Sequence, residues 1–266
     1  MQECKVTTAV ILCGGKGSRL GEVTGGDIPK PMVNVGNQPI LFHIMNYYSK
    51  FGINDFILCV GHKSWKIKEF FLNYQKAKSD LLIDFGNNNV EAGLLSAPGL
   101  NWKVRICETG EETQTAGRLK QIRRYLSDEP FMLTYGDGIC DVDLHALQNF
   151  HNEHSGEVTI TGIVPPGRFG ELILDGNTVT EWAEKPQVTD RYINGGFMCM
   201  DPCFIDKYIK TDSYSVMLEH EPLERGSEAQ TVKVFKHSGF WQCMDNPRDY
   251  TLLNSMYAKG ELDWLN

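Results

Sequence analysis

Residues 10–32 read VILCGGKGSRLGEVTGGDIPKPM and form the most informative segment of the chain. It begins inside a short apolar run, residues 8–12, which is typical of a buried strand. Three glycines follow at once, and glycine lets another group approach the backbone closely. Successive N–H groups in such a loop converge on an anion, and the planar guanidinium of Arg19 suits phosphate oxygens. The stretch therefore predicts a strand that ends in an anion-binding loop.

The spacing of this loop differs from two familiar phosphate-binding motifs. The dinucleotide fingerprint needs a glycine at its sixth position, and counting from Gly15 that position is Leu20. The Walker loop needs Ser or Thr after its lysine, whereas Lys16 is followed by glycine. Further along, Lys30 lies between two prolines, which would hold its ammonium in place. For the glycines alone, an ordinary strand-to-helix turn with a surface arginine stays open.

Length and composition limit the classes of function. The 266 residues, 41% of them hydrophobic, suffice for a single large domain spanning residues 1–266. A formal net charge of −8 argues against nucleic acid or an anionic membrane as a partner. No apolar stretch approaches the roughly 20 residues that span a bilayer. The N-terminus lacks the features of a signal peptide, and the eight cysteines include no CxxC pair, so we expect reduced thiols and a cytoplasmic protein.

Apolar runs that suit strands alternate, in the first half, with stretches that suit helices. The strand-like runs are residues 8–12, 55–60, 103–107, 131–135, 158–164, 196–200 and 231–235. The helix-like stretches are residues 39–51, 64–74 and 116–126. This order predicts an α/β fold with a mostly parallel central sheet, in which ligands bind beyond the carboxyl ends of the strands. Strands dominate later, so we expect an added β-rich C-terminal portion.

Two acidic residues follow strand-like runs and are candidate metal ligands. Asp137 lies between two glycines in FMLTYGDGICDVD, residues 131–143, where a carboxylate can approach a cation without steric interference. Asp245 follows an aromatic run in GFWQCMDNPRD, residues 239–249. Two carboxylates at separate strand ends would suit one Mg²⁺ ion, which prefers oxygen ligands. The structural alternatives are an Asp-Gly turn for Asp137 and a helix N-cap for Asp245.

The remaining polar motifs point to a small substrate or to ordinary turns. WAEKPQ, residues 182–187, offers Glu184 and Lys185, and YINGGFMCM, residues 192–200, offers Asn194 for sugar hydroxyls. A loop turn is the alternative for each. His151 and His154 lack a third ligand nearby, so a solvated helix end is expected rather than a zinc site. A hydrolytic triad has no support, since no Gly-x-Ser-x-Gly occurs.

Taken together, the motifs resemble those of a known enzyme family. LCGGKGSRL followed by PKPM is similar to the signature of nucleotidyltransferases that make nucleoside diphosphate sugars. TYGDG, PPGRFG, EKP, INGGF and GFWQCMD resemble most specifically the glucose-1-phosphate cytidylyltransferases. The resemblance implies a Rossmann-like nucleotidyltransferase fold. It also implies Mg²⁺-dependent attack of a sugar-1-phosphate oxygen on the α-phosphorus of CTP, with release of pyrophosphate.

The resemblance also implies a role for individual residues. Those implied to bind the nucleotide are Leu12, Gly14, Gly15, Gly17, Ser18, Arg19, Lys30, Thr115, Gly117 and Arg118. Those implied to bind the acceptor are Tyr135, Gly136, Gly170, Glu184, Lys185 and Asn194. Arg19, Lys30 and Lys185 are implied to be catalytic. Asp137 and Asp245 are implied to hold Mg²⁺.

The expected partners are CTP and a small phosphorylated acceptor, foremost glucose-1-phosphate. A homo-oligomer is also expected, with aromatic surfaces around Trp65, Phe70 and Trp264 as contacts. Two alternatives stay open. One is a CTP-dependent enzyme for a different sugar phosphate or a small non-sugar phosphate. The other is a non-catalytic homologue that binds nucleotide sugars, against which the joint presence of the implied catalytic and metal-binding residues argues.

Overall fold

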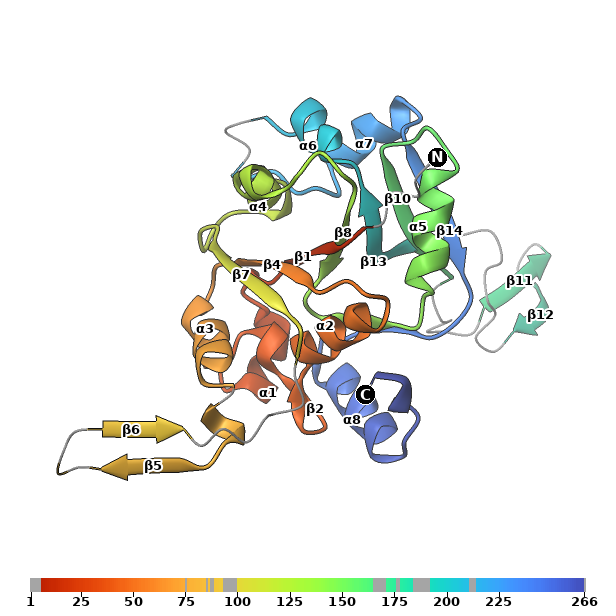
Figure 1. Cartoon of the computed structure of the whole chain (residues 1–266). Helices are drawn as coiled ribbons and strands as arrows, with labels where there is room; N and C mark the ends of the chain where they lie inside the picture. Colours follow the sequence, from red (N-terminus) through yellow and green to blue (C-terminus); the bar gives the residue numbers. More distant parts are fainter. Residues whose placement is uncertain are drawn as a thin grey trace.

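A computed structural model describes residues 6–74, 76–84, 86, 89–92, 100–164, 171–175, 178–183, 192–210 and 214–265. A seven-stranded sheet in the order β14-β10-β13-β8-β1-β4-β7 forms its centre (Figure 1). The strands are β1 (Thr8–Leu12), β4 (Asp55–Val60), β7 (Lys103–Glu108), β8 (Phe131–Tyr135), β10 (Val158–Ile163), β13 (Ile193–Met200) and β14 (Val232–His237). All seven strand-like runs of the sequence therefore form strands of one sheet.

The central sheet is mostly parallel, as the alternation of runs predicts. β1 pairs in parallel with β4 and β8, β4 pairs in parallel with β7, and β10 pairs in parallel with β14. β13 is the exception, because it runs antiparallel to both β8 and β10. A parallel neighbour needs a crossover, commonly a helix, whereas the described residues between β10 and β13 form only a hairpin.

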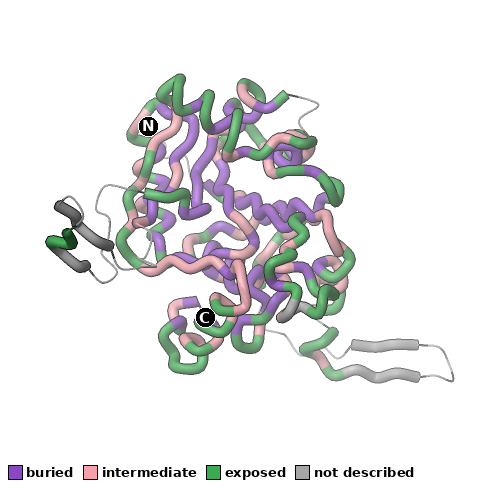
Figure 2. Tube along the Cα trace, turned by 180° about the vertical axis from the view of Figure 1, so that it is seen from behind, coloured by how far each residue is buried: buried purple, intermediate pink, exposed green. Residues whose placement is uncertain are grey.

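Two apolar layers cover the two faces of the sheet, and Figure 2 shows its buried strands at the centre. Alternate residues of β1 enter different core clusters, Ala9 and Ile11 on one face, Val10 and Leu12 on the other. The first face is covered by α2 (Ile40–Lys50), α3 (Ser64–Asn73), α5 (Leu144–Asn152) and α8 (Pro247–Ala258). The second is covered by α4 (Thr115–Ile122), α6 (Pro202–Tyr208) and α7 (Glu221–Glu228). Burial on both faces explains why β1 reads as a continuous apolar run.

Short two-stranded elements surround this sheet. They are β2 (Asn34–Val35) with β3 (Gln38–Pro39), β5 (Leu81–Asp84) with β6 (Asn89–Ala92), β9 (Gly138–Cys140) with β15 (Trp241–Cys243), and β11 (Glu171–Asp175) with β12 (Thr178–Ala183). β11–β12 and β9–β15 form the β-rich addition expected from the later half of the sequence. The β5–β6 hairpin extends from the other side (Figure 1) and was not among the predicted strands. A short helix, α1 (Gly21–Thr24), follows the glycine-rich loop.

Two local predictions were wrong in detail. His151 is 4% exposed, and it shares the hydroxyl of Thr159 with His154 at 2.8 Å from each ring, so this helix end is not solvated. The N-cap of α8 is Asn246, whose side chain accepts the N–H groups of the first helical turn. Asp245 is therefore not the cap, and its carboxylate is left to face the loops at the end of the sheet. No helix among the described residues is long and apolar enough to cross a membrane.

Candidate active site

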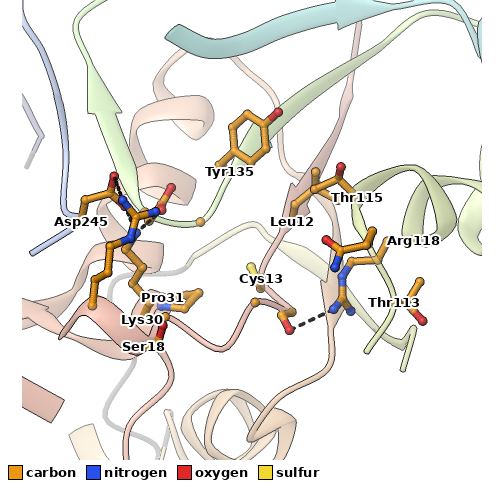
Figure 3. A pocket seen from close by; sticks show the side chains of 17 residues that line it. Leu12, Cys13, Ser18, Lys30, Pro31, Thr113, Thr115, Arg118, Tyr135 and Asp245 are labelled. Atoms are coloured by element: carbon orange, nitrogen blue, oxygen red, sulfur yellow. Dashed lines mark hydrogen bonds and ion pairs between the residues drawn. The ribbon is translucent and has the colours of Figure 1, made fainter. Parts of the chain in front are cut away.

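A cavity of about 290 Å³ opens beyond the carboxyl ends of β1 and β8, where a parallel sheet binds its ligands (Figure 3). Most of the residues implied for the nucleotide and the metal line it, together with two of those implied for the acceptor, although they come from distant parts of the chain. These are Leu12, Gly14, Gly15, Gly17, Ser18, Arg19, Lys30, Thr115, Arg118, Tyr135, Gly136, Asp137 and Asp245. The cavity also includes four residues that the sequence did not single out as site residues, Cys13, Pro31, Thr113 and Gln114.

The glycine-rich loop follows β1 and forms the floor of the cavity. Gly17 has a φ of 57°, in the left-handed region that favours glycine, and a Cβ there would lie 3.0 Å from the Cβ of Lys30. This close approach brings the loop against the segment that carries Lys30. Gly15 is exposed, and a Cβ built on it would meet nothing within 4 Å. One glycine thus shapes the loop, while the other leaves its backbone open to a ligand.

Arg118, from the first turns of α4, forms one end of the cavity. Its guanidinium is 3% exposed and donates to the carbonyl oxygens of Gly14 (2.9 Å), Val60 (3.2 Å) and Gly110 (2.9 Å). It also donates to the hydroxyl of Thr109 at 2.6 Å. These acceptors follow or end β1, β4 and β7, so one side chain ties three neighbouring strand ends together. No carboxylate contacts it among the described residues, and burial lowers the pKa of Arg118.

Lys30 forms the opposite end, as Figure 3 shows. Its Nζ lies 2.6 Å from a carboxylate oxygen of Asp137 and 2.5 Å from one of Asp245. The two acids come from different elements, since Asp137 lies in the turn between β8 and β9 and Asp245 follows β15. Both contact one nitrogen, so the two carboxylates are close neighbours. The expectation that they converge is met by this geometry.

The charges at this end explain the state of the lysine. Burial lowers the pKa of Lys30, but attraction and hydrogen bonds from Asp137 and Asp245 outweigh burial, so the pKa is raised overall. The ammonium is therefore the counter-ion of two carboxylates. Paired carboxylates within reach of one cation are a fitting ligand set for Mg²⁺, which takes a few protein oxygens and completes its shell with water and phosphate.

Arg19 lies at the mouth of the same end. Its side chain is 76% exposed, and its guanidinium is 3.3 Å from the second oxygen of Asp245. The backbone N–H of Asp245 donates to the carboxylate of Asp249 at 2.9 Å, and Asp249 also belongs to the capping box of α8. This bond fixes the backbone from which the side chain of Asp245 extends. An exposed pair of this kind stabilises little, so Arg19 is free to bind an anion.

A second, smaller cavity of about 60 Å³ adjoins the first and shares Tyr135 and Asp137 with it. Asn194 lines it, and its side-chain oxygen accepts the N–H of Gly196 at 2.8 Å. The hydroxyl of Tyr135 hydrogen-bonds to Glu219, which also accepts from Thr115 at 2.8 Å. Glu219 therefore holds two residues that line the larger cavity, one of which also lines the smaller one, and no local pattern in the sequence marked it.

The remaining implied residues fall in two groups. Gly117 is buried within α4 and does not line the cavity. Gly170, Glu184 and Lys185 lie outside the described residues. The described residues thus include the nucleotide and metal ends of the site and, of the implied acceptor residues, Tyr135, Gly136 and Asn194.

Comparison with known proteins agrees with this geometry. Residues 8–258 match the nucleotidyl transferase family. The glucose-1-phosphate cytidylyltransferase of Salmonella typhi is 42% identical over 257 residues, covering 96% of this chain and 98% of that protein. The probable glucose-1-phosphate cytidylyltransferase of Bacillus subtilis is 40% identical over 256 residues, covering 96% and 98%. Among solved structures, HddC from Yersinia pseudotuberculosis shares the fold, with a TM-score of 0.66 at 24% identity over 95% of this chain and 100% of that one. Over almost its whole length, then, the chain belongs to the nucleotidyl transferase family.

Proposed function

We propose that this nucleotidyltransferase joins CTP and glucose-1-phosphate to give CDP-glucose and pyrophosphate. A phosphate oxygen of the sugar phosphate attacks the α-phosphorus of CTP, and the bond from that phosphorus to the β-phosphate oxygen breaks. The observation that carries the proposal is Lys30 held between Asp137 and Asp245 at one end of a glycine-rich loop. The names of the relatives in Salmonella typhi and Bacillus subtilis support the choice of CTP and glucose-1-phosphate.

The loop and the two basic ends of the cavity suit a triphosphate. The open backbone at Gly15 offers N–H groups, and the buried charge of Arg118 has no carboxylate partner among the described residues. A polyanion would supply the missing counter-charge. The exposed guanidinium of Arg19 would bind the phosphates from the solvent side.

Members of this family generally use a divalent metal, and we propose Mg²⁺ held by Asp137 and Asp245. The ion supplies charge that stabilises the reacting phosphates. Lys30 would then exchange its carboxylate partners for oxygens of the α-phosphate, where an ammonium offsets the charge that develops on attack. No covalent intermediate with the protein is needed, since positioning and charge stabilisation suffice.

The acceptor is proposed to bind in the smaller cavity beside Tyr135 and Asn194, with Glu184 and Lys185 completing its site. Asn194 and Asp137 line the same smaller cavity, which suits a sugar whose phosphate must reach the metal end. A homo-oligomer in the cytoplasm remains part of the proposal, on the resemblance alone.

Release of pyrophosphate tests the proposal directly. The protein is mixed with Mg²⁺, each of the four common ribonucleoside triphosphates, and a panel of glucose-1-phosphate, other sugar-1-phosphates and small non-sugar phosphates. We expect turnover with CTP and glucose-1-phosphate, and a large loss in Asp137→Asn. Asp143→Asn is the matched control, because Asp143 caps α5 outside the cavity and asparagine caps equally well. Turnover of CTP only with another phosphate would overturn the acceptor, and no turnover in the panel would overturn the enzyme.

A further inference from the structure

A second cluster of metal-ligating side chains lies three residues beyond Asp137, outside the active-site cavity. One sulfur of Cys140, one carboxylate oxygen of Asp141 and one ring nitrogen of His237 all lie within 4.8 Å of one another. Cys140 ends β9, and His237 ends β14, so two distant segments meet there. We propose that these three side chains form a binding site for a zinc-like transition metal ion.

The histidine nitrogen supports this assignment. Nε2 of His237 lies 2.8 Å from Oδ1 of Asp141, yet it is buried and makes no hydrogen bond among the described residues. Nitrogen and oxygen are thus close but not oriented as donor and acceptor, and a small separation of the two would let both contact one cation. A buried ring nitrogen that makes no hydrogen bond costs free energy, and a metal ion would remove that cost.

The backbone around the cluster is shaped to leave room for it. A Cβ on Gly239 would lie 2.3 Å from Oδ1 of Asp141 and 2.7 Å from Cε1 of His237, so only glycine fits there without displacing the ligands. The N–H of Asp141 donates to the carbonyl of Phe240 at 3.1 Å, which holds the loop after β14 against β9. The N–H of Val142 donates to the sulfur of Cys140.

The ligand types select the metal. Thiolate and imidazole favour zinc and its neighbours over Mg²⁺, which prefers the all-oxygen pair at Asp137 and Asp245. Cys140 and His237 are 1% and 12% exposed, whereas the side chain of Asp141 is 39% exposed and gives the ion a path from solvent. Three protein ligands and one water complete a tetrahedral shell.

Binding would require one proton to leave the cluster. Burial raises the pKa of the Cys140 thiol to about 12, so the thiol carries its proton in the metal-free protein. The metal–sulfur bond replaces the S–H bond, the proton goes to solvent, and no oxidation occurs.

The position of the site suggests what the metal does. β9 and β15 form one ribbon, in which the N–H of Met244 donates to the carbonyl of Asp137 at 2.8 Å. Asp137 and Asp245 stand at one end of this ribbon, and the proposed site stands at the other. A metal there would fix the ribbon to the end of β14 and so hold the two active-site carboxylates in register.

Cobalt substitution tests the site without reference to activity. The full-length protein is titrated with Co²⁺ in excess Mg²⁺, and absorbance is followed in the near ultraviolet, where cobalt–thiolate charge transfer absorbs, and in the visible d–d region. We expect both signals to saturate at one ion per chain. Cys140→Ser should abolish the charge-transfer band, and His237→Asn should weaken binding at least tenfold.

Two cysteine controls separate this site from other thiols. Cys243 lies near Asp137 and Asp245, so Cys243→Ser shows whether cobalt binds at the active site instead. Cys203 is exposed and distant in the fold, and Cys203→Ser should leave the band unchanged. A band lost in Cys243→Ser but kept in Cys140→Ser would overturn the proposal, as would no band in the wild type.

Thermal unfolding with Zn²⁺ gives a second readout that does not need a folded Cys140 variant. At about a hundredfold excess over the dissociation constant, the melting temperature of the wild type should rise by roughly 5 °C. His237→Asn should show no such rise, and His220→Asn, at an exposed histidine, should match the wild type. An equal rise in His237→Asn would place zinc elsewhere and overturn the assignment.

Discussion

The two ends of the nucleotide cavity each hold a basic side chain, but the two cations have different surroundings. Arg118 is surrounded by carbonyl oxygens and a hydroxyl, which are neutral and belong to three strand ends. Lys30 is surrounded by two carboxylates, which are charged and which we propose as ligands of the metal. A cation held by backbone cannot change partners without disturbing the fold. A cation held by two acidic side chains could change partners without disturbing the fold, if those acids held a metal ion as proposed.

This difference indicates a structural role for Arg118 and a role in the proposed reaction for Lys30. Arg118 fixes where the loop after β1 lies relative to β4 and β7. Because its guanidinium keeps these partners, its positive charge stays at one place beside the cavity. In the proposed reaction, Lys30 stands where charge must be rearranged. The resemblance implies that both residues bind the nucleotide and that Lys30 alone of the two is catalytic, and their contacts differ in the same sense.

The largest effect on folding is expected from Arg118→Met. Removing the guanidinium takes a charged donor from the carbonyls of Gly14, Val60 and Gly110, although Gly14 and Val60 keep the N–H groups of His62 and Thr109. The loss should cost about 3 kcal/mol of unfolding free energy. Urea unfolding measures the loss. Arg118→Lys keeps the charge but not the planar fork, so it should recover only part of the stability.

Arg19→Met is the matched control at the exposed end. The side chain is 76% exposed, and its ion pair with Asp245 should contribute less than about 1 kcal/mol. If Arg118→Met were as stable as Arg19→Met, Arg118 would not act as a clamp that holds the ends of β1, β4 and β7 together.

Lys30→Met is expected to affect mainly catalysis, whereas Arg118→Met affects mainly stability. Loss of a positioned charge at the reacting phosphate should lower kcat by about 10²–10³-fold. Steady-state kinetics with CTP and glucose-1-phosphate, at saturating Mg²⁺, measure the loss. Because Lys30 is 13% exposed and pairs with two acids, a small loss of stability is expected beside the loss of kcat. A normal kcat would remove Lys30 from the reaction.

The sequence predicted what depends on local pattern. The apolar runs located all seven strands of the sheet, and the glycine-rich loop and Asp137 were placed at strand ends because the runs stop there. The clamp made by Arg118 could not be predicted from the sequence, because its acceptors are backbone carbonyls, which every residue has. Glu219 was missed for a related reason, because its partners Tyr135 and Thr115 are far away in the chain. The sequence left open whether Asp245 is the N-cap of a helix, and the structure excludes this because Asn246 is the N-cap of α8.

A pair of neighbouring glycines tests the clamp at smaller scale. A Cβ on Gly14 would lie 2.0 Å from Nη1 of Arg118, whereas a Cβ on Gly15 would meet nothing within 4 Å. Gly14→Ala should therefore push the guanidinium away and cost about 1–3 kcal/mol of unfolding free energy. Gly15→Ala should change stability by less than about 0.5 kcal/mol. Equal losses in the two variants would show that the loop, rather than its contact with Arg118, limits stability.

The smallest expected effect concerns alkaline pH and distinguishes the charge of Lys30 from its shape. Its folded-state pKa is raised above the ordinary 10.5, because the two carboxylates outweigh the burial that lowers it. A group with a raised pKa contributes stability that is fully present below its unfolded pKa and is lost as the pH rises through the folded one. The stability difference between wild type and Lys30→Met, about 1 kcal/mol, should thus be constant from pH 8 to about 10 and decline above 10.5.

Lys30→Arg stays charged in this range, so its difference from Lys30→Met should not decline. Urea unfolding of the three proteins at each pH measures both differences, and a wild-type difference that is flat above pH 11 would mean that packing of the lysine side chain, not its charge, stabilises this end of the cavity.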